Sequence, residues 1–431
     1  MYKRRIIDQR IEELLNAPVA IQLKGSKWCG KTTTGKHFSK SFIDLQSPTQ
    51  GANYKLIAEN NIALLLEGEK PRLIDEWQEV KTIWNAVRRE VDDSPSKKVE
   101  YFLTGSVVPT DTEGLHTGLG RIVGLEMKPM SLFESGESNG SVSLSSLLKS
   151  DVMVQSHSSL TYSDLAYLTC RGGWPKIIDL SPEQALLIAQ SYVTEFCERD
   201  VSRYDGVKRD PLLAKAILKA YSRQISTIDS DTSLFKDVQS IFGDVSQTTL
   251  KQYLHVFQSL FVIDEISSWN PNIRSKTAIS SSPKKSFVDP SIAAAALQCT
   301  PKDLELDPET FGLLFENLVD RDLSVYLANR GGHLQHYRDR YGVECDSIVC
   351  FPSGEYGLVQ AKLGGKKVEE AIDTMLKIAS LIEKNKAEHP EDKTLRMPSF
   401  MLVVTGTEYA YKVTNKGKGS IYVVPLGCLK D

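Results

Sequence analysis

The residues most able to do chemistry in this 431-residue sequence lie near its beginning, in the run KGSKWCGKTTT at residues 24–34. The run contains a glycine, four further residues and then Gly-Lys-Thr, which is the spacing of a phosphate-binding loop. The apolar stretch VAIQL precedes it and TTTGKHFSKSF, which reads as a helix, follows it. Because such a loop works between a strand and a helix, the sequence predicts a site for the phosphates of ATP.

The residues of this loop have different expected roles. Backbone N–H groups of the glycine-rich turn wrap the phosphates, and the following helix adds the positive end of its dipole. Lys31 is expected to reach the β- and γ-phosphates, and the Thr32 hydroxyl to ligate Mg²⁺. Phosphate chemistry does not explain Trp28 or Cys29, so we expect both side chains to face the protein. The predicted nucleotide-binding set is Gly25, Ser26, Lys27, Trp28, Cys29, Gly30, Lys31, Thr32 and Thr33.

A pair of carboxylates supports this prediction. The apolar stretch RLIDEW ends in Asp75 and Glu76. An Asp-Glu pair alone is usually a solvated turn, but this one follows a strand, where α/β sheets place their ligands. We therefore expect Asp75 to bind Mg²⁺ and Glu76 to activate the attacking water.

Two further polar positions complete the predicted catalytic set of Lys31, Glu76, Thr104 and Arg121. The strand-like VEYFLTGS places Thr104 or Ser106 near the γ-phosphate as a polar sensor, although a hydroxyl at a strand end is often a turn cap. Arg121 in HTGLGRI is expected to contact the γ-phosphate in cis or to reach a neighbouring subunit's site. A solvated arginine is an equally weighted alternative.

The composition is that of an ordinary globular protein of 48 kDa, with 25% charged and 41% hydrophobic residues. This length predicts two or three domains. The net charge of −3 excludes a general attraction to nucleic acid. Seven cysteines without a CxxC pair indicate reduced thiols rather than a zinc site. No segment is long enough to span a bilayer, so we expect a cytoplasmic protein without a membrane partner.

Strands alternate with helices through the first part of the chain, which predicts the parallel sheet of an α/β fold. Helical character then follows, and after PSIAAAAL a second and smaller α/β block begins. We expect a P-loop ATPase core over residues 1–150, a helical lid over 151–230, a winged-helix segment over 231–300 and an α/β domain over 301–431.

Several motifs together resemble a prokaryotic family of AAA-type ATPases. They are GSKWCGKT, PRLIDEWQEV, LTGS, HTGLGRIVGLEMKPMSLFESGES and RGGWP, and the match continues through SPKKSFVDPSIAAAAL, LLFENLV and YRDRYGVECD. The resemblance implies an ATPase core, a winged-helix segment and a C-terminal domain of unknown function that resembles restriction endonucleases, the PD-(D/E)xK fold. Biological roles in that family are largely undefined.

If residues 236–268 form a helix-turn-helix, its second helix begins near Ser246. Leu250, Leu254 and Phe257 suit the core face, and the polar face carries Gln247, Thr248, Lys251 and Gln252. Electrostatics dominates DNA affinity, so one lysine predicts weak binding. A basic wing of Arg274, Lys276, Lys284 and Lys285 would add charge. A packing module within the ATPase is an equally strong interpretation.

The C-terminal block carries a candidate nuclease site, formed by Glu316, Asp346, Gln360 and Lys362. Alternation places Gln360 and Lys362 on one face of their strand, where they can meet Asp346 around Mg²⁺. Nucleases of the restriction-endonuclease fold usually have Glu at the position of Gln360. An amide oxygen is a weaker metal ligand than a carboxylate, although some nucleases that resemble this fold use Gln-x-Lys. Alternatively, Glu344, Asp346 and Lys362 form a structural salt-bridge cluster.

Three functional hypotheses follow. The first is an ATPase that couples its nucleotide state to the C-terminal module. The second is an ATP-regulated, metal-dependent nuclease that acts on DNA or RNA. The third is a non-enzymatic switch in which ATP binding sets the conformation of the helical and winged-helix segments for a DNA or protein partner. Oligomerisation, and with it an arginine finger from a neighbour, stays open.

Overall fold

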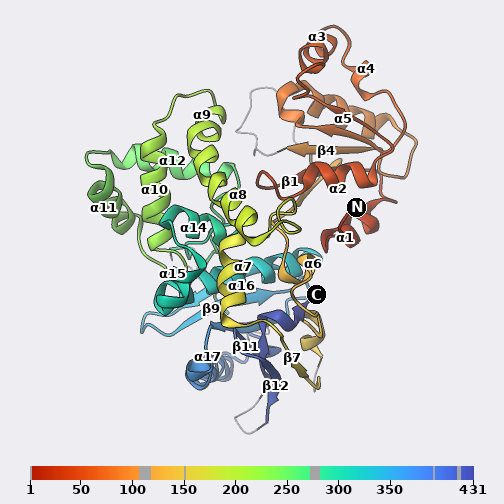
Figure 1. The fold of residues 1–431 in the computed structure, drawn as a ribbon. Coiled ribbons are helices and arrows are strands. Elements are labelled where there is room, and N and C mark those ends of the chain that lie inside the picture. Colours follow the sequence, from red (N-terminus) through yellow and green to blue (C-terminus); the bar gives the residue numbers. More distant parts are fainter. Residues whose placement is uncertain (1, 106–117, 150–151, 272–281, 392–393, 415–418) are drawn as a thin grey trace. The chain divides into compact units, whose positions relative to one another are not determined.

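The computed structural model describes the chain except for residues 1, 106–117, 150–151, 272–281, 392–393 and 415–418 (Figure 1). The chain divides into two compact units. The first contains Met1–Pro129 and Val256–Val262, and the second contains Met130–His255 and Ile263–Asp431. Each is built around sheets and helices of its own, as a chain of this length predicts.

The first unit contains a five-stranded parallel sheet of order β2-β3-β4-β1-β5. This confirms the parallel sheet expected from the alternation of strands and helices. Strand β4 lies between β1 and β3, so the strand that runs into the glycine loop is not the neighbour of the strand that ends in Asp75. The strands are β1 Ala20–Lys24, β2 Ser41–Asp44, β3 Arg72–Asp75, β4 Tyr101–Gly105 and β5 Ile122–Glu126.

Helices cover both faces of this sheet. Successive residues of a strand point to opposite faces. Leu73 therefore packs in the cluster that contains Ile11 of α1, whereas Ile74 packs in the cluster that contains Ile83 and Val87 of α5. The helical segments are α1 Ile7–Leu14, α2 Lys31–Phe38, α3 Gly51–Asn61, α4 Ala63–Leu66, the 3₁₀ helix η1 Trp77–Val80 and α5 Thr82–Asp93.

The second unit begins with a largely helical part, as the sequence predicted. Helix α12 begins within one residue of the expected position, and Leu250 and Leu254 are buried. Two isolated antiparallel bridges follow it, Ile263 to Phe287 and Ile266 to Lys284. The helices are α6 Leu132–Ser135, α7 Tyr162–Arg171, α8 Pro182–Glu195, α9 Val201–Arg203, α10 Pro211–Arg223, α11 Asp231–Phe242, α12 Gln247–Ser259, α14 Pro290–Leu297 and α15 Pro301–Leu306. The end of α12, from Val256 onward, belongs to the first unit.

The C-terminal part of this unit is a seven-stranded mixed sheet of order β7-β12-β13-β11-β10-β9-β8. Strands β8, β9 and β10 are antiparallel, whereas β10, β11 and β13 run parallel. Helix α16 (Pro308–Ala328) precedes β8, and α17 (Val368–Glu388) connects β10 to β11. The strands are β7 Gln155–His157, β8 His333–Arg338, β9 Glu344–Cys350, β10 Tyr356–Lys362, β11 Phe400–Thr405, β12 Tyr409–Val413 and β13 Ile421–Pro425.

The segment after Pro129 does not belong to the first unit, so the expected domain boundary at residue 150 moves to Pro129. Strand β6 (Val142–Ser143) pairs with β14 (Leu429–Lys430), and β7 pairs with β12. These pairings satisfy strand edges that would otherwise present unpaired N–H and C=O groups. Pairing between the middle and the end of the chain therefore sets the boundary.

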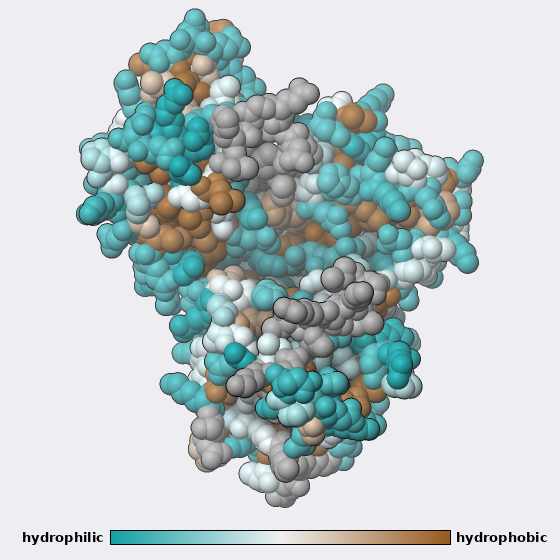
Figure 2. All heavy atoms as spheres, turned by 180° about the vertical axis from the view of Figure 1, so that it is seen from behind, coloured by the Kyte–Doolittle hydropathy of each residue, from teal (hydrophilic) through white to brown (hydrophobic). Residues whose placement is uncertain are grey.

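Helices α16 and α17 have 21 residues each, but no helix among the described residues is long and apolar enough to cross a bilayer. The face in Figure 2 shows hydrophilic side chains interspersed with separate hydrophobic patches. All seven cysteines have free thiols, six of them on buried residues and Cys299 half-buried.

One buried cation holds four segments of the second unit together. The Arg321 guanidinium bonds Asp289 at 3.0 Å and Asp322 at 2.7 and 2.9 Å, and all three side chains are fully buried. Asp289 also accepts a hydrogen bond from the Gly173 N–H at 2.9 Å, and Asp322 from the Leu132 N–H at 3.0 Å. The motif RGGWP therefore has a packing role, because the backbone N–H of its residue Gly173 bonds the carboxylate of Asp289.

Replacing Arg321 by Met should destabilise the second unit severely. The change leaves two buried carboxylates without their cation, which costs roughly 3–5 kcal/mol. Urea unfolding followed by tryptophan fluorescence measures the loss. Lys302→Ala is the control, because Lys302 and Glu305 form an exposed pair at 2.9 Å that is worth less than about 1 kcal/mol. Equal losses in the two variants would contradict the importance of the Arg321 network.

Candidate functional site

The glycine loop that follows β1 requires two of its glycines. Gly25 has φ 146° and Gly30 has φ 105°, both in the region that favours glycine. A Cβ atom on Gly25 would lie 2.1 Å from the Met127 carbonyl oxygen. Gly30 is the residue directly before α2, so the loop delivers the chain into the helix N-terminus. The predicted strand–loop–helix arrangement is therefore present.

The Lys31 side chain is buried within this loop. Its ammonium donates to the carbonyl oxygens of Gly25 at 2.9 Å and Ser26 at 2.7 Å. The Arg5 guanidinium supports the loop from outside by donating to the Cys29 carbonyl oxygen at 2.7 Å. Lys31 thus holds a positive charge where phosphates would meet the loop.

The Asp75 carboxylate joins the loop to the centre of the sheet. Its Oδ1 accepts a hydrogen bond from the Thr32 hydroxyl at 2.9 Å and another from the Thr104 hydroxyl. Strand register explains the second bond, because Thr104 of β4 pairs with Asp75 of β3 on one side and with Leu23 of β1 on the other. Carboxylate and hydroxyl oxygens are ligands that Mg²⁺ prefers, so this donor set fits the ion.

Glu76 follows Asp75 in a left-handed conformation, with φ 54° and ψ 48°. This turn separates the two carboxylates, and the Glu76 carboxylate accepts a hydrogen bond from the Gln78 side chain. Burial raises the pKa of Glu76, although the bond from Gln78 and the charge of Lys31 oppose the rise. A raised pKa brings a carboxylate closer to the range in which it serves as a base near neutral pH.

The other loop residues differ in exposure. Ser26 is fully buried, and its hydroxyl has no partner among the described residues. Lys27 is half-buried, and Thr33 is exposed. Cys29 is buried, as expected, but the expectation for Trp28 was wrong, because its side chain is 38% exposed. The left-handed backbone of Trp28, with φ 68°, turns the chain so that Cys29 packs into the core instead.

The position of Arg121 contradicts a contact with the γ-phosphate in cis. Arg121 directly precedes β5, and its carbonyl oxygen accepts from the N–H of Ala20 at the start of β1. The glycine loop follows the opposite end of β1, which is five residues long and so spans roughly 16 Å. The Arg121 guanidinium pairs instead with Asp92 at 2.7 Å. Ser106, the other sensor candidate, lies outside the described residues.

Comparison with known proteins identifies two regions. Residues 18–135 match the family model of an AAA domain. This part of the chain, which contains the glycine loop, is therefore similar to P-loop domains of the AAA type. The match confirms the resemblance for the first unit and supports ATP binding there. Residues 162–303 match the model of a domain of unknown function, DUF8612, which covers most of the helical part of the second unit.

Similar whole proteins are also known. Uncharacterized proteins of Mycobacterium bovis and Mycobacterium tuberculosis are each 22% identical over 423 residues, which is 94% of this chain and 86% of the relative. The Walker-type ATPase of Pyrococcus abyssi aligns with a TM-score of 0.41 and 14% identity, over 68% of this chain and 96% of the other.

The predicted nuclease-like residues Asp346, Gln360 and Lys362 do come together, on the antiparallel pair β9 and β10. Asp346 accepts from the Lys362 ammonium at 3.1 Å and from the Ala361 N–H at 2.8 Å. The Gln360 amide donates to the Glu344 carbonyl oxygen at 2.9 Å. The three side chains line one cavity of about 380 Å³.

Glu316, the fourth predicted residue, is bound instead to a lysine that was expected elsewhere. The Lys284 ammonium lies 2.9 Å from the Glu316 carboxylate, 2.7 Å from the Asp320 carboxylate and 2.7 Å from the Asp346 carbonyl oxygen. Its side chain is only 3% exposed. Lys285 is buried too, and its ammonium donates to the Asp229 carbonyl oxygen.

The expected basic wing is therefore wrong for both lysines, and Arg274 and Lys276 lie outside the described residues. The backbone bridge between Ile266 and Lys284 explains the burial of Lys284, because it fixes the chain beside α16. Asp320 was missed by sequence reasoning. Its spacing of four from Glu316 on a largely buried helix was the available signal, since two buried carboxylates on one helix face require a cation.

This cluster holds more negative than positive charge, with Glu316, Asp320 and Asp346 facing Lys284 and Lys362. Burial raises the pKa of Glu316 to about 8, since the repulsion from Asp346 and Asp320 adds to burial and outweighs the attraction of Lys284. Among the described residues, no group of three or more His, Cys, Asp and Glu side chains is arranged to hold a metal ion. The ammonium of Lys284 is the cation between these acids.

The retained proton on Glu316 predicts how stability depends on pH. The pKa of Glu316 is about 8 in the folded protein and about 4.3 in an unfolded chain. Between these values the folded state binds a proton that the unfolded state lacks, so the free energy of unfolding falls as pH rises from 5 to 8. Urea unfolding across this range measures the slope, and Glu316→Gln should flatten it. The same slope in both proteins would contradict the assignment.

Proposed function

We propose that the protein hydrolyses ATP with Mg²⁺ at the first unit and couples its nucleotide state to the second unit. The observation that supports this best is the Asp75 carboxylate, which accepts hydrogen bonds from Thr32 of the loop and Thr104 of the central strand. A hydroxyl and a carboxylate in contact at the end of a glycine loop form the two protein ligands that Mg²⁺ uses in phosphoryl transfer.

Each side chain has a role in this proposal. The Lys31 ammonium exchanges its bonds to the loop carbonyls for bonds to the β- and γ-phosphates. Thr32 and Asp75 would hold Mg²⁺, which would neutralise phosphate charge when bound. Glu76 accepts the proton of the attacking water, for which its raised pKa suits it. Thr104 holds Asp75 in position. Arg121 does not reach the phosphates of its own chain, so its proposed role is that of an arginine finger for a neighbouring copy.

Coupling is proposed from the chain that joins the site to the second unit. The Met127 N–H donates to the Lys24 carbonyl oxygen at 2.8 Å, directly before the glycine loop. Three residues later, the Met130 N–H donates to the Gly173 carbonyl oxygen at 2.6 Å, and Leu132 meets Asp322 of the Arg321 network. The few residues from Met127 to Leu132 therefore connect the loop to the second unit, and a shift of the loop on nucleotide binding is transmitted along them.

The nuclease hypothesis is the weaker alternative. The meeting of Asp346 and Lys362 favours the restriction-endonuclease-like fold that the resemblance implies. However, Glu316 is bound to the Lys284 ammonium, and Gln360 replaces a carboxylate by an amide. Both features lower the affinity for a divalent ion. The winged-helix segment likewise stays a proposal, supported by helices α11 and α12 and the two antiparallel bridges after them.

Substitutions at the nucleotide site should separate binding from hydrolysis. Lys31→Ala removes the cation of the loop and should abolish ATP binding. Glu76→Gln retains the shape of the site but not the base, so it should bind ATP and hydrolyse it at least about 100-fold more slowly. Steady-state phosphate release with Mg²⁺ and ATP measures the rates.

Glu79→Gln is the matched control for the second variant. Glu79 lies three residues further on, and its carboxylate pairs with Lys55 at 2.9 Å. Its substitution should leave turnover near that of the wild type. A Glu76→Gln protein that hydrolyses ATP as fast as the Glu79→Gln control would rule out Glu76 as the base.

A further inference from the structure

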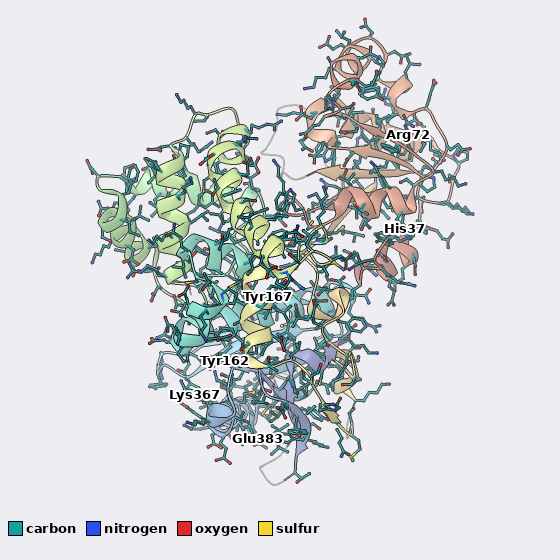
Figure 3. All side chains as sticks on the ribbon, viewed as in Figure 1. His37, Arg72, Tyr162, Tyr167, Lys367 and Glu383 are labelled. Carbon is teal, nitrogen blue, oxygen red and sulfur yellow. The ribbon has the colours of Figure 1, made fainter. Side chains whose placement is uncertain are left out.

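The second unit contains a cavity of about 860 Å³ that the proposed ATPase does not use. It lies among the first residue of α7, the beginning of α16 and the turn between β10 and α17. Figure 3 labels Tyr162 and Lys367, which line it from two of these elements.

Three glycines of this wall have no structural reason to be glycine. Neither Gly312, Gly364 nor Gly365 has a positive φ. A Cβ atom on Gly312 or Gly364 would meet nothing within 4 Å, and one on Gly365 would make only an ordinary contact of 3.7 Å. Gly357 of the neighbouring strand differs, because a Cβ there would lie 2.4 Å from the Phe400 ring.

The glycine in α16 has a cost. Glycine inside a helix is less favourable than alanine. Since neither backbone conformation nor packing requires Gly312, the open space beside it is the remaining explanation. Space of this kind lets a ligand approach the backbone closely.

The charge of the wall favours a phosphate. Lys366 and Lys367 are exposed and form no ion pair with any described residue, and Lys362 lies beside them. The acid that reaches the cavity from α16, Glu316, has a pKa raised by burial and is bound to Lys284. Glu309, at the start of the same helix, is exposed to solvent. The Gly364–Lys367 turn therefore presents a concentration of positive charge.

The wall on the side of α7 favours an aromatic base. The Tyr162 side chain is 38% exposed, although its ring is large and apolar. Its ring meets Phe311 nearly edge to face, with centroids 5.0 Å apart and planes at 66°, which fixes the orientation of Tyr162. Bases stack on aromatic side chains held in this way, with little preference for sequence.

We propose that this cavity binds a nucleotide unit, with its base on Tyr162 and its phosphate at Lys366 and Lys367, beside the open backbone of Gly312. The site is separate from the glycine loop and does not depend on ATP hydrolysis. A single-stranded nucleic acid and a free nucleotide both supply this chemistry.

The test uses the full chain with Lys31→Ala, so that the glycine loop does not contribute. Fluorescence anisotropy with a labelled thymidine 12-mer measures strand binding, and calorimetry with AMP measures free nucleotide. Tyr162→Ala should weaken binding about 5- to 150-fold, whereas Tyr162→Phe should retain it. Lys366→Glu should weaken it about tenfold or more, and Lys384→Glu, an equal charge change at an exposed position of α17, should have little effect.

Gly312→Ala gives the sharpest result. It should raise the thermal stability of the protein, because alanine favours the helix, and should weaken binding at the same time. If Gly312 had a structural role, Gly312→Ala should instead lower the thermal stability. Binding of the 12-mer identifies a strand as the ligand, and binding of AMP alone identifies a free nucleotide. Binding of neither, or binding unchanged by Tyr162→Ala, Lys366→Glu and Gly312→Ala, would overturn the proposal.

Discussion

The carboxylate of Asp75 holds together the three chain segments that form the phosphate site. It accepts the hydroxyl of Thr32 at the start of α2 and that of Thr104 at the end of β4, while Asp75 itself ends β3. Both hydroxyls bond Oδ1. Oδ2 has no hydrogen bond to a described residue and is therefore left for a cation. The order of strands makes this possible, because β4 lies between β1 and β3 and places Thr104 between the loop and the acid.

The second unit is organised by two buried cations of different character. Arg321 is matched by the two carboxylates of Asp289 and Asp322, and its network fixes the segment that leaves the first unit. Lys284 faces a surplus of acids, so one of them keeps a proton. Buried ion pairs of this kind are costly to desolvate and costly to break, and they therefore fix the positions of the segments they join.

Local patterns predicted much of the nucleotide site. The glycine spacing, the strand that ends in Asp75 and Glu76 and the strand that ends in Thr104 each occupy a few residues, so their sequences carry the signal. Long-range pairing set the rest. The place of Arg121 follows from the register of β5 on β1, and the burial of Lys284 follows from its partners on α16 and β9. Neither relation is visible in the spacing of neighbouring residues.

We propose that Asp75 brings Mg²⁺ to ATP in the glycine loop. Calorimetric titration of ATP into the protein, with and without Mg²⁺, tests it most directly in the wild type and in Asp75→Asn. The amide keeps the shape of Asp75 and can still accept the Thr32 hydroxyl, but it is a weaker ligand for the ion. Mg²⁺ should tighten ATP binding by the wild type and add little in Asp75→Asn. An equal gain from Mg²⁺ in both proteins would contradict it.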